Sequence, residues 1–218
     1  MPDEAYSKLR SLIVGGELQP NQRLVEIELA GELGVGRAAV RTALARLAQE
    51  GLVEHERNRG ARVRLVSERE AVEILEARAV LEGLVARHAA LAAEPAAVEG
   101  MREVLAEMRN RLEAGDLLAA SDQNAILHER ILRAADHATA ARLISGLSSQ
   151  LVRFQYKTIL LPQRSERTLA EHEAIVEAIA AGDGDGAEAA MRAHLSNVAE
   201  ALRVAAGAGQ AAPEGTRG

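Results

Sequence analysis

Three histidines and one asparagine in the C-terminal two thirds of the chain have the types and spacing of a metal site. Asn124 and His128 are four residues apart, so their side chains meet on one face of a helix. His172 and His194 each lie on the apolar stripe of a separate predicted helix, which points them toward a core. Three imidazoles and one amide oxygen suit a divalent transition metal such as zinc, nickel or manganese. Any one of these histidines alone is more often a hydrogen-bonded core residue, but three on separate inward stripes favour a shared polar cavity.

Arg78 brings a positive charge to the same predicted core. It is in line with apolar residues on its helix, and a buried arginine is costly unless an anion meets it. The cavity could therefore bind a small organic anion, with Arg78 as counter-charge. The competing interpretation is an ion pair with a glutamate of the chain, such as Glu82.

A second group of residues, near the amino end, has the chemistry of a DNA-reading surface. Two short predicted helices, 27–33 and 37–50, are joined by a glycine-containing turn, which describes a helix-turn-helix. In the second of them Arg37, Ala38 and Arg41 lie away from the apolar stripe that Val40 and Leu44 begin. A small, cationic helix face suits the major groove, where arginine donates two hydrogen bonds to guanine.

Residues 52–65 change to an alternating pattern, which predicts a β-hairpin directly after the helix-turn-helix. Its turn contains Arg57, Asn58 and Gly60. A basic hairpin tip beside a basic helix favours contact with phosphates or the minor groove over a merely solvated turn. The N-terminal segment therefore reads as a winged helix-turn-helix.

The charge distribution agrees with this placement. The chain has 218 residues and a formal net charge of −6, but residues 35–64 contain seven arginines and only three glutamates. Residues 67–218 contain 16 basic and 23 acidic residues. The positive charge is concentrated where a phosphate-contacting surface is expected.

Composition indicates a mostly α-helical protein. Hydrophobic residues make up 48% of the chain and aromatic residues 1%, so Ala, Leu, Val and Ile must build the core. There is no cysteine, no apolar run near the ~20 residues of a membrane span, and no apolar segment typical of a secretory signal. We expect a cytoplasmic protein with no membrane partner.

The pattern predicts two domains. Residues 1–66 form the winged helix-turn-helix, 67–69 a linker, and 70–206 an all-helical bundle for effector binding and dimerisation, followed by a disordered tail at 207–218. The predicted helices of the second half lie near 68–93, 95–114, 116–135, 138–161, 165–181 and 184–206.

The chain resembles the GntR family of bacterial transcription regulators, in the FadR-like branch with an FCD effector domain. The resemblance covers about residues 5–205 and rests on LAGELGVGRAAVRTALARLAQEGLV, RNRGARV, RAVLE, NAILH and EHEAIVEAIAAGD. The usual family residues are absent at four positions of the turn and recognition helix, which changes the expected operator sequence but not the DNA-binding role: Gly36, Ala38, Ala39 and Thr42.

The resemblance implies roles for individual residues. The family's DNA contacts fall on Arg37, Arg41, Arg57 and Asn58, and its wing glycine on Gly60. Its metal ligands, an Asp or Asn four residues before a His and then two further His, map onto Asn124, His128, His172 and His194. It also implies a homodimer on a short palindromic operator, released when a small carboxylate binds the metal.

The sequence therefore predicts a DNA-binding transcription regulator, a repressor rather than an activator, and no enzyme. Two alternatives remain open at this point. One is a metal-dependent hydrolase on a helical scaffold, although no general base or nucleophile accompanies the predicted ligands. The other is a winged helix used only for protein contact.

Overall fold

A computed structural model describes residues 2–56, 60–151, 154, 161 and 164–210, and the side chains of all of these except 2, 3, 56 and 206–210. The chain divides into two compact units, which are considered separately. The first contains Met1–Ser67 and Gly146–Arg153, and the second contains Glu68–Ser145 and Phe154–Gly218. We call them the N-terminal unit and the helical unit.

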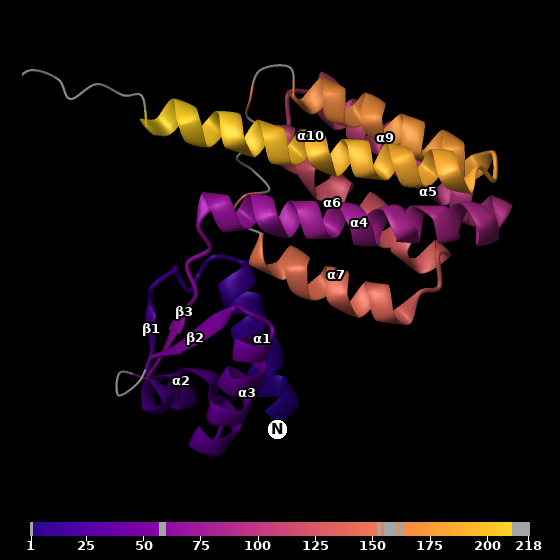
Figure 1. Ribbon diagram of the computed structural model, residues 1–218. Coiled ribbons are helices and arrows are strands. Elements are labelled where there is room, and N and C mark those ends of the chain that lie inside the picture. Colours follow the sequence, from indigo (N-terminus) through magenta and orange to yellow (C-terminus); the bar gives the residue numbers. More distant parts are fainter. Residues whose placement is uncertain (1, 57–59, 152–153, 155–160, 162–163, 211–218) are drawn as a thin grey trace, which may run out of the picture. The chain divides into compact units, whose positions relative to one another are not determined.

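Three helices build most of the N-terminal unit: α1 (Pro2–Val14), α2 (Glu26–Leu33) and α3 (Arg37–Gln49), drawn in indigo and violet in Figure 1. The apolar stripe predicted for α3 is confirmed, because Val40, Leu44 and Leu47 are all buried. They pack with Leu9 of α1 into one hydrophobic core. Burial of this stripe leaves the opposite side of α3 exposed to solvent.

Glycines set the ends of α2 and α3. Gly34 ends α2 with a φ of 67° and donates its N–H to the carbonyl of Ala30. Gly51 follows α3 with a φ of 73°. Both values lie in the left-handed region, which glycine adopts without the steric cost of a Cβ atom. The turn between the two helices is therefore as short as the sequence predicted.

A three-stranded antiparallel sheet completes this unit. It is formed by β1 (Arg23–Leu24), β2 (Val53–Glu56) and β3 (Gly60–Val63) in the order β1-β3-β2. Val53 faces Val63 across the hairpin, and alternate residues of β3 are buried, as a strand with one solvated face requires. The predicted hairpin is confirmed, while its tip, residues 57–59, lies outside the described residues.

The helical unit consists of long helices, shown from magenta to yellow in Figure 1. Its described helices are α4 (Glu68–Ala92), α5 (Pro95–Glu113), α6 (Leu117–Ala134), α9 (Arg164–Ala180), α10 (Gly184–Gln210) and the first part of α7 (Ala138–Gln150). The end of α7, from Gly146 on, belongs to the N-terminal unit.

Two boundaries differ from the prediction. Of the helix expected at 138–161, α7 covers Ala138–Gln150 and Leu151 lies in a turn, while residues 152–153 and 155–160 lie outside the described residues. Glycine and serine in its last residues, SGLSSQ, have weak helix propensity. In contrast, α10 continues to Gln210, four residues beyond the expected end, because its alanine-rich end still favours a helix. Residues 207–210 of the expected disordered tail are therefore helical, and residues 211–218 lie outside the described residues.

Packing in the helical unit brings four helices together. α10 runs along α4 and also packs against α9, while α6 contacts α4 (Figure 1). These four helices carry all the residues predicted for the metal and effector sites. No helix among the described residues has the length and apolar character that crossing a bilayer requires.

Candidate metal centre and DNA interface

The three predicted metal-binding histidines meet in the core of the helical unit. His128 comes from α6, His172 from α9 and His194 from α10. Their ring centroids are 4.4–5.4 Å apart, and one ligand nitrogen from each lies within 4.8 Å of the others. His172 and His194 are buried, and His128 is mostly buried. This spacing allows one ion to be shared by three imidazoles.

A glutamate fixes the orientation of His128. Oε2 of Glu82, on α4, lies 2.6 Å from Nδ1 of His128, and Glu82 is 3% exposed. Burial alone would raise the pKa of Glu82, but the charge of Arg78 and the contact with His128 outweigh it and lower the pKa to about 2. An ionised carboxylate can only accept hydrogen bonds, so Nδ1 of His128 is the donor. Nε2 is then the nitrogen with a free lone pair.

The same arrangement recurs at His194. Its Nδ1 lies 2.8 Å from Oε2 of Glu171, which also accepts hydrogen bonds from Arg164 and Asn197. Burial raises the pKa of Glu171, but the hydrogen bonds from His194 and Arg164 outweigh this and the pKa is lowered. His194 therefore donates from Nδ1 and presents Nε2. A carboxylate behind a ligating histidine is the usual support of a metal site, since it fixes both tautomer and ring orientation.

His172 has no such support. It is completely buried, and neither Nδ1 nor Nε2 has a hydrogen-bond partner among the described residues. Burial, together with the neighbouring His194 and His128, lowers its pKa well below the ordinary value. A neutral imidazole carries one donor and one acceptor, and each unsatisfied buried polar group costs about 1–3 kcal/mol.

These residues fit a divalent metal ion. His172 and His194 are neutral imidazoles, because burial lowers the pKa of His172 well below its ordinary value and that of His194 to about 4. Metal ligation requires the neutral form, and an ion would satisfy one of the orphaned nitrogens of His172. The donor set of three nitrogens suits zinc or nickel, and also manganese when oxygen ligands complete the site.

The other two predicted residues of this site lie on the expected helices. Arg78 of α4 donates from Nε to Oε1 of Glu82 at 2.6 Å, so the ion pair that the sequence allowed is present. Within the described part of the chain, its terminal Nη nitrogens have no hydrogen-bond partner. Asn124 is half-buried on α6, one turn before His128. Its role as a fourth ligand stays a prediction.

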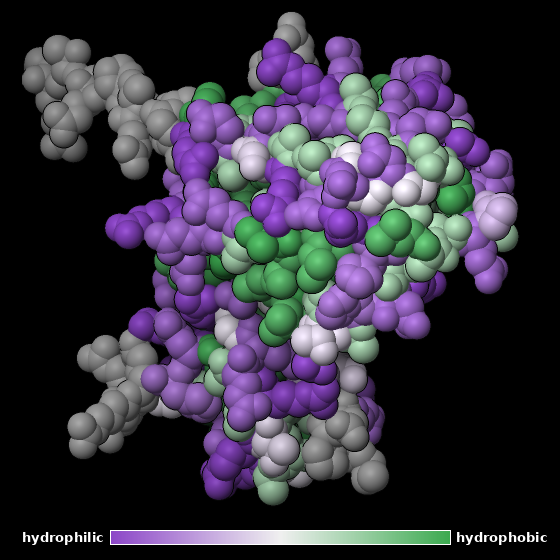
Figure 2. All heavy atoms as spheres, turned by 45° about the vertical axis from the view of Figure 1, so that its right-hand side comes forward, coloured by the Kyte–Doolittle hydropathy of each residue, from purple (hydrophilic) through white to green (hydrophobic). Residues whose placement is uncertain are grey.

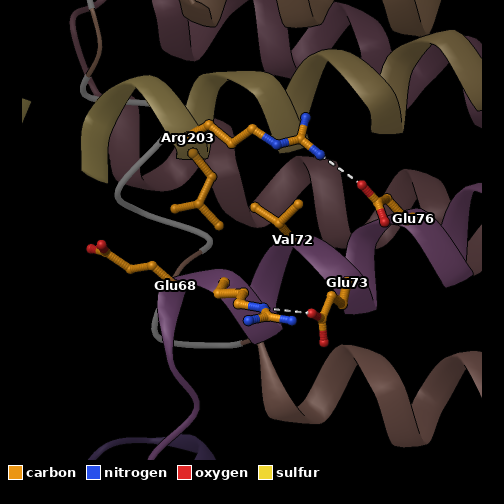
Figure 3. A pocket seen from close by; sticks show the side chains of 7 residues that line it. Glu68, Val72, Glu73, Glu76 and Arg203 are labelled. Carbon is orange, nitrogen blue, oxygen red and sulfur yellow. Dashed lines mark hydrogen bonds and ion pairs between the residues drawn. The ribbon is translucent and has the colours of Figure 1, made fainter. Parts of the chain in front are cut away.

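A separate hollow of about 450 Å³ lies in the helical unit beside α4 and α10 (Figure 3). The described residues that line it are Glu68, Arg69, Val72, Glu73, Glu76, Leu202 and Arg203. Arg69 is paired with Glu73 at 3.0 Å, and Arg203 with Glu76 at 2.6 Å. Because glutamates of the lining already neutralise both arginines, this hollow is a weaker site for a carboxylate than the histidine cluster.

The predicted DNA-reading residues of α3 are on the solvent side of the N-terminal unit. Ala38 is exposed, and the side chains of Arg37 and Arg41 are 61% and 67% exposed. Both arginines contact Glu26 at the start of α2, which the sequence did not indicate. On the wing, Gly60 begins β3, whereas Arg57 and Asn58 lie outside the described residues.

Sequence reasoning missed the carboxylates that support the histidines. Glu82 was expected only as a partner of Arg78, and Glu171 and Arg164 were not singled out. Glu171 precedes His172 directly in the sequence, yet its carboxylate accepts a hydrogen bond from His194 on the next helix. The signal that could have identified it is an acidic residue on a largely inward helix face, which requires a partner.

The chain matches two protein families. Residues 2–63 match the bacterial regulatory proteins of the gntR family, and residues 73–197 match the FCD domain. Among solved structures, Escherichia coli McbR/YncC has a TM-score of 0.76 at 20% sequence identity, covering 93% of this chain and 97% of that one. This likeness establishes the shared fold.

Curated relatives of similar length are regulators of transcription. The chain is 32% identical to the HTH-type transcriptional regulator LutR of Bacillus subtilis, over 88% of this chain and 96% of that protein. It is 31% identical to a putative L-lactate dehydrogenase operon regulatory protein of Escherichia coli, over 91% of this chain and 84% of that protein. It is 32% identical to a probable D-xylose utilization operon repressor of Paenarthrobacter nicotinovorans, over 87% and 85%. These relatives are not enzymes, so the hydrolase interpretation is set aside. With a winged helix-turn-helix followed by an FCD domain, the chain belongs to the GntR family of bacterial transcription regulators.

Proposed function

We propose that this protein is a repressor that binds a palindromic operator as a homodimer and leaves it when a small carboxylate binds at the histidine cluster. The observation that carries the proposal is this buried cluster of three histidines behind a DNA-binding domain. Both the operator and the effector are reached in the cytoplasm, where we expect the protein to act.

The exposed face of α3 supports the DNA-binding half of the proposal. Arg37 and Arg41 are solvent-accessible, and the small Ala38 between them allows the helix backbone to approach base edges. The opposite face of α3 is anchored in the core by Leu44 and Leu47. We infer that α3 enters the major groove with its amino-terminal half, while the wing contacts the backbone through Arg57 and Asn58.

The histidine cluster supports the effector half. We assign His128, His172 and His194 as the protein ligands of a divalent ion, with Asn124 as a fourth. When bound, the ion supplies a positive centre that attracts a carboxylate. The free Nη nitrogens of Arg78 would bind a second anionic or hydroxyl oxygen of the same molecule.

The names of relatives point to the class of effector. One relative is the putative L-lactate dehydrogenase operon regulatory protein named above. Another is the gluconate operon transcriptional repressor of Bacillus licheniformis, to which the chain is 30% identical over 82% of this chain and 75% of that protein. Lactate and gluconate are both 2-hydroxycarboxylates, which offer adjacent carboxylate and hydroxyl oxygens. We therefore propose a small hydroxycarboxylate as the effector.

Exposed apolar residues of α4 support dimerisation. Val80 and Leu91 are 54% and 67% exposed on one side of the helix, where they alternate with the charged residues Glu73, Glu76 and Arg87. Figure 2 shows hydrophobic side chains interspersed with hydrophilic ones on the face of the helical unit in view. A second copy packing on this face would bury it and present two α3 helices to the half-sites of a palindrome.

The decisive experiment is a fluorescence-polarisation titration against duplexes from the promoter of the protein's own operon. We expect salt-sensitive binding that prefers one palindromic sequence over a scrambled duplex. Arg41→Ala should reduce that preference by about 1–3 kcal/mol at one base pair, if Arg41 reads a base. Equal loss on all sequences would make Arg41 a phosphate contact, and no selective binding by the wild type would refute the proposal.

The effector half has its own measurement. Lactate, gluconate and related hydroxycarboxylates are added to the preformed complex with operator DNA, with and without prior chelation of metal. We expect release by at least one of them only when metal is present. A winged helix used only for protein contact would instead predict no loss of function when Arg37 and Arg41 are both replaced by glutamate.

A further inference from the structure

Glu26 holds both of the arginines assigned to DNA reading. Nε of Arg41 donates to Oε1 of Glu26 at 3.0 Å, and Nη2 of Arg41 donates to Oε2 at 2.8 Å. Nη2 of Arg37 lies 3.9 Å from the same Oε2. The contact joins the first residue of α2 to the first two turns of α3, and the side chain of Glu26 is only 29% exposed.

The geometry of the pair leaves one edge of the Arg41 guanidinium free. A guanidinium has five N–H groups in a fixed plane, and two parallel bonds to a carboxylate use one edge, formed by Nε and Nη2. The end of the group, formed by Nη1 and the second hydrogen of Nη2, still presents two parallel donors. Nη1 has no partner among the residues that the structure describes. Two parallel donors are what O6 and N7 of a guanine accept.

The pair therefore orients Arg41 without using up its capacity to read a base. A free arginine side chain loses rotamer freedom when it binds, and a side chain already fixed in the binding orientation loses less. Glu26 stays ionised in this role, because the hydrogen bond from Arg41 lowers its pKa. Its position at the positive end of the α2 dipole also favours the carboxylate.

The carboxylate has an opposite effect on affinity for DNA in general. A negative charge beside a phosphate-contacting surface weakens binding to every sequence. Glu26 should therefore lower the affinity for all DNA sequences and increase the discrimination between them. An exposed glutamate with no arginine partner should only lower the affinity.

We propose that Glu26 is a specificity-determining residue of this regulator, because it positions Arg41 for end-on recognition of one guanine. This inference rests on the proposed DNA-binding function. It concerns a residue that touches Arg41, not the DNA bases, so Glu26 is a positioning residue.

The test compares Glu26→Gln with Glu28→Gln. Glu28 lies in the same first turn of α2 and is exposed, so its variant also removes one negative charge but keeps the hydrogen bonds between Glu26 and Arg41. A duplex is first selected by the wild-type protein from a random-sequence pool, and a scrambled duplex of equal length serves as reference. Dissociation constants for both are measured by polarisation at one salt concentration, and thermal melts verify folding of each variant.

We expect Glu28→Gln to leave the ratio of selected to scrambled affinity unchanged. Glu26→Gln should reduce this ratio by at least about fivefold, while its affinity for the scrambled duplex is equal or higher. The loss should occur at the same base pair at which Arg41→Ala loses discrimination, and the double variant should lose little more than Arg41→Ala alone.

Two results would overturn the inference. An unchanged ratio for Glu26→Gln means that the ion pair with Glu26 does not position Arg41. A higher ratio means that Glu26 competes with DNA for Arg41 and inhibits reading. If the wild type itself binds both duplexes equally, the proposed DNA-reading function fails, and the inference fails with it.

Discussion

Nδ1 of His194 lies 2.8 Å from Oε2 of Glu171, and both oxygens of that carboxylate accept hydrogen bonds from Arg164 at N–O distances of 2.9–3.0 Å. Because the ion pair with Arg164 fixes the Glu171 carboxylate, the hydrogen bond from Nδ1 fixes the orientation of the His194 ring. Glu82, between Arg78 and His128, repeats the arrangement on α4. Each of the two supported histidines thus has its own Arg–Glu pair.

Glu171→Gln should weaken metal binding by about 10–100-fold, because an amide can flip its donor toward Nδ1 and no longer fixes the ligating tautomer. Glu173→Gln, on the exposed side of the same helix, is the matched control. Competition titrations with a chromophoric chelator measure both affinities. Equal affinity for zinc in the two variants would show that the carboxylate has no part in the site.

The double variant His128→Ala, His172→Ala should abolish metal binding, since it removes two of three ligand nitrogens. Elemental analysis of protein purified without a polyhistidine tag should find about one divalent ion per wild-type chain and almost none in the variant. The melting temperature should fall with the loss of the ion, because binding to the folded state stabilises it. His55→Ala, an exposed histidine of the N-terminal unit, should keep its metal. Equally little metal in wild type and double variant would make the cluster a dry polar core.

The metal-free protein should lose stability in acid. The folded-state pKa of His194 is about 4 and that of His172 is lowered well below its ordinary value, which is 6.5 for histidine. Below pH 6.5 the unfolded chain binds more protons, so the free energy of unfolding falls as the pH falls toward 4. For His194 the loss is about 3 kcal/mol, at 1.36 kcal/mol per pKa unit.

Glu82 extends this loss to lower pH. Its folded-state pKa is about 2 against an ordinary value of 4.5, so the stability it provides disappears as the pH falls from 4.5 to 2.

Urea unfolding of chelator-treated protein at pH 7.5, 5.5 and 4.0 measures the upper part of the range. His194→Gln should show a shallower decline between 6.5 and 4, and a wild-type stability independent of pH there would contradict the assignment.

Gly34→Ala should destabilise the N-terminal unit by about 1 kcal/mol, because the φ of +67° places a Cβ atom in a strained backbone conformation. Gly31→Ala is the control within the same helix, since its backbone is helical and a Cβ meets nothing within 4 Å. It should stabilise by about 0.5–1 kcal/mol. Chemical denaturation of the two variants measures both signs, and equal effects would refute the role given to the turn.

Val80→Glu should convert the protein from dimer to monomer, because it places a charge at an exposed apolar residue of α4 that we propose a second copy covers. Sedimentation velocity measures the change. Leu118→Glu is the control, since Leu118 is 56% exposed on α6 and lies off the proposed interface. A dimer that survives Val80→Glu and dissociates with Leu118→Glu would move the interface to α6.

Much of the fold could be predicted because helical and strand periods are local. The spacing of Val40, Leu44 and Leu47 was enough to orient α3, and glycine at position 34 was enough to end α2. The ends of α7 and α10 were predicted less well, because apolar periodicity does not mark where a helix stops; there the propensities of a Gly/Ser segment and an Ala/Gly segment decided.

The candidate site divides along the same line. Since a helix repeats every 3.6 residues, the sequence by itself determined that His128, His172 and His194 point inward, and that Arg37, Ala38 and Arg41 point outward. Which carboxylate faces each cation or imidazole depends on how separate helices pack, and no spacing encodes it. Only the tertiary structure therefore paired Glu171 with His194 across 23 residues, and Glu26 with Arg41 across 15.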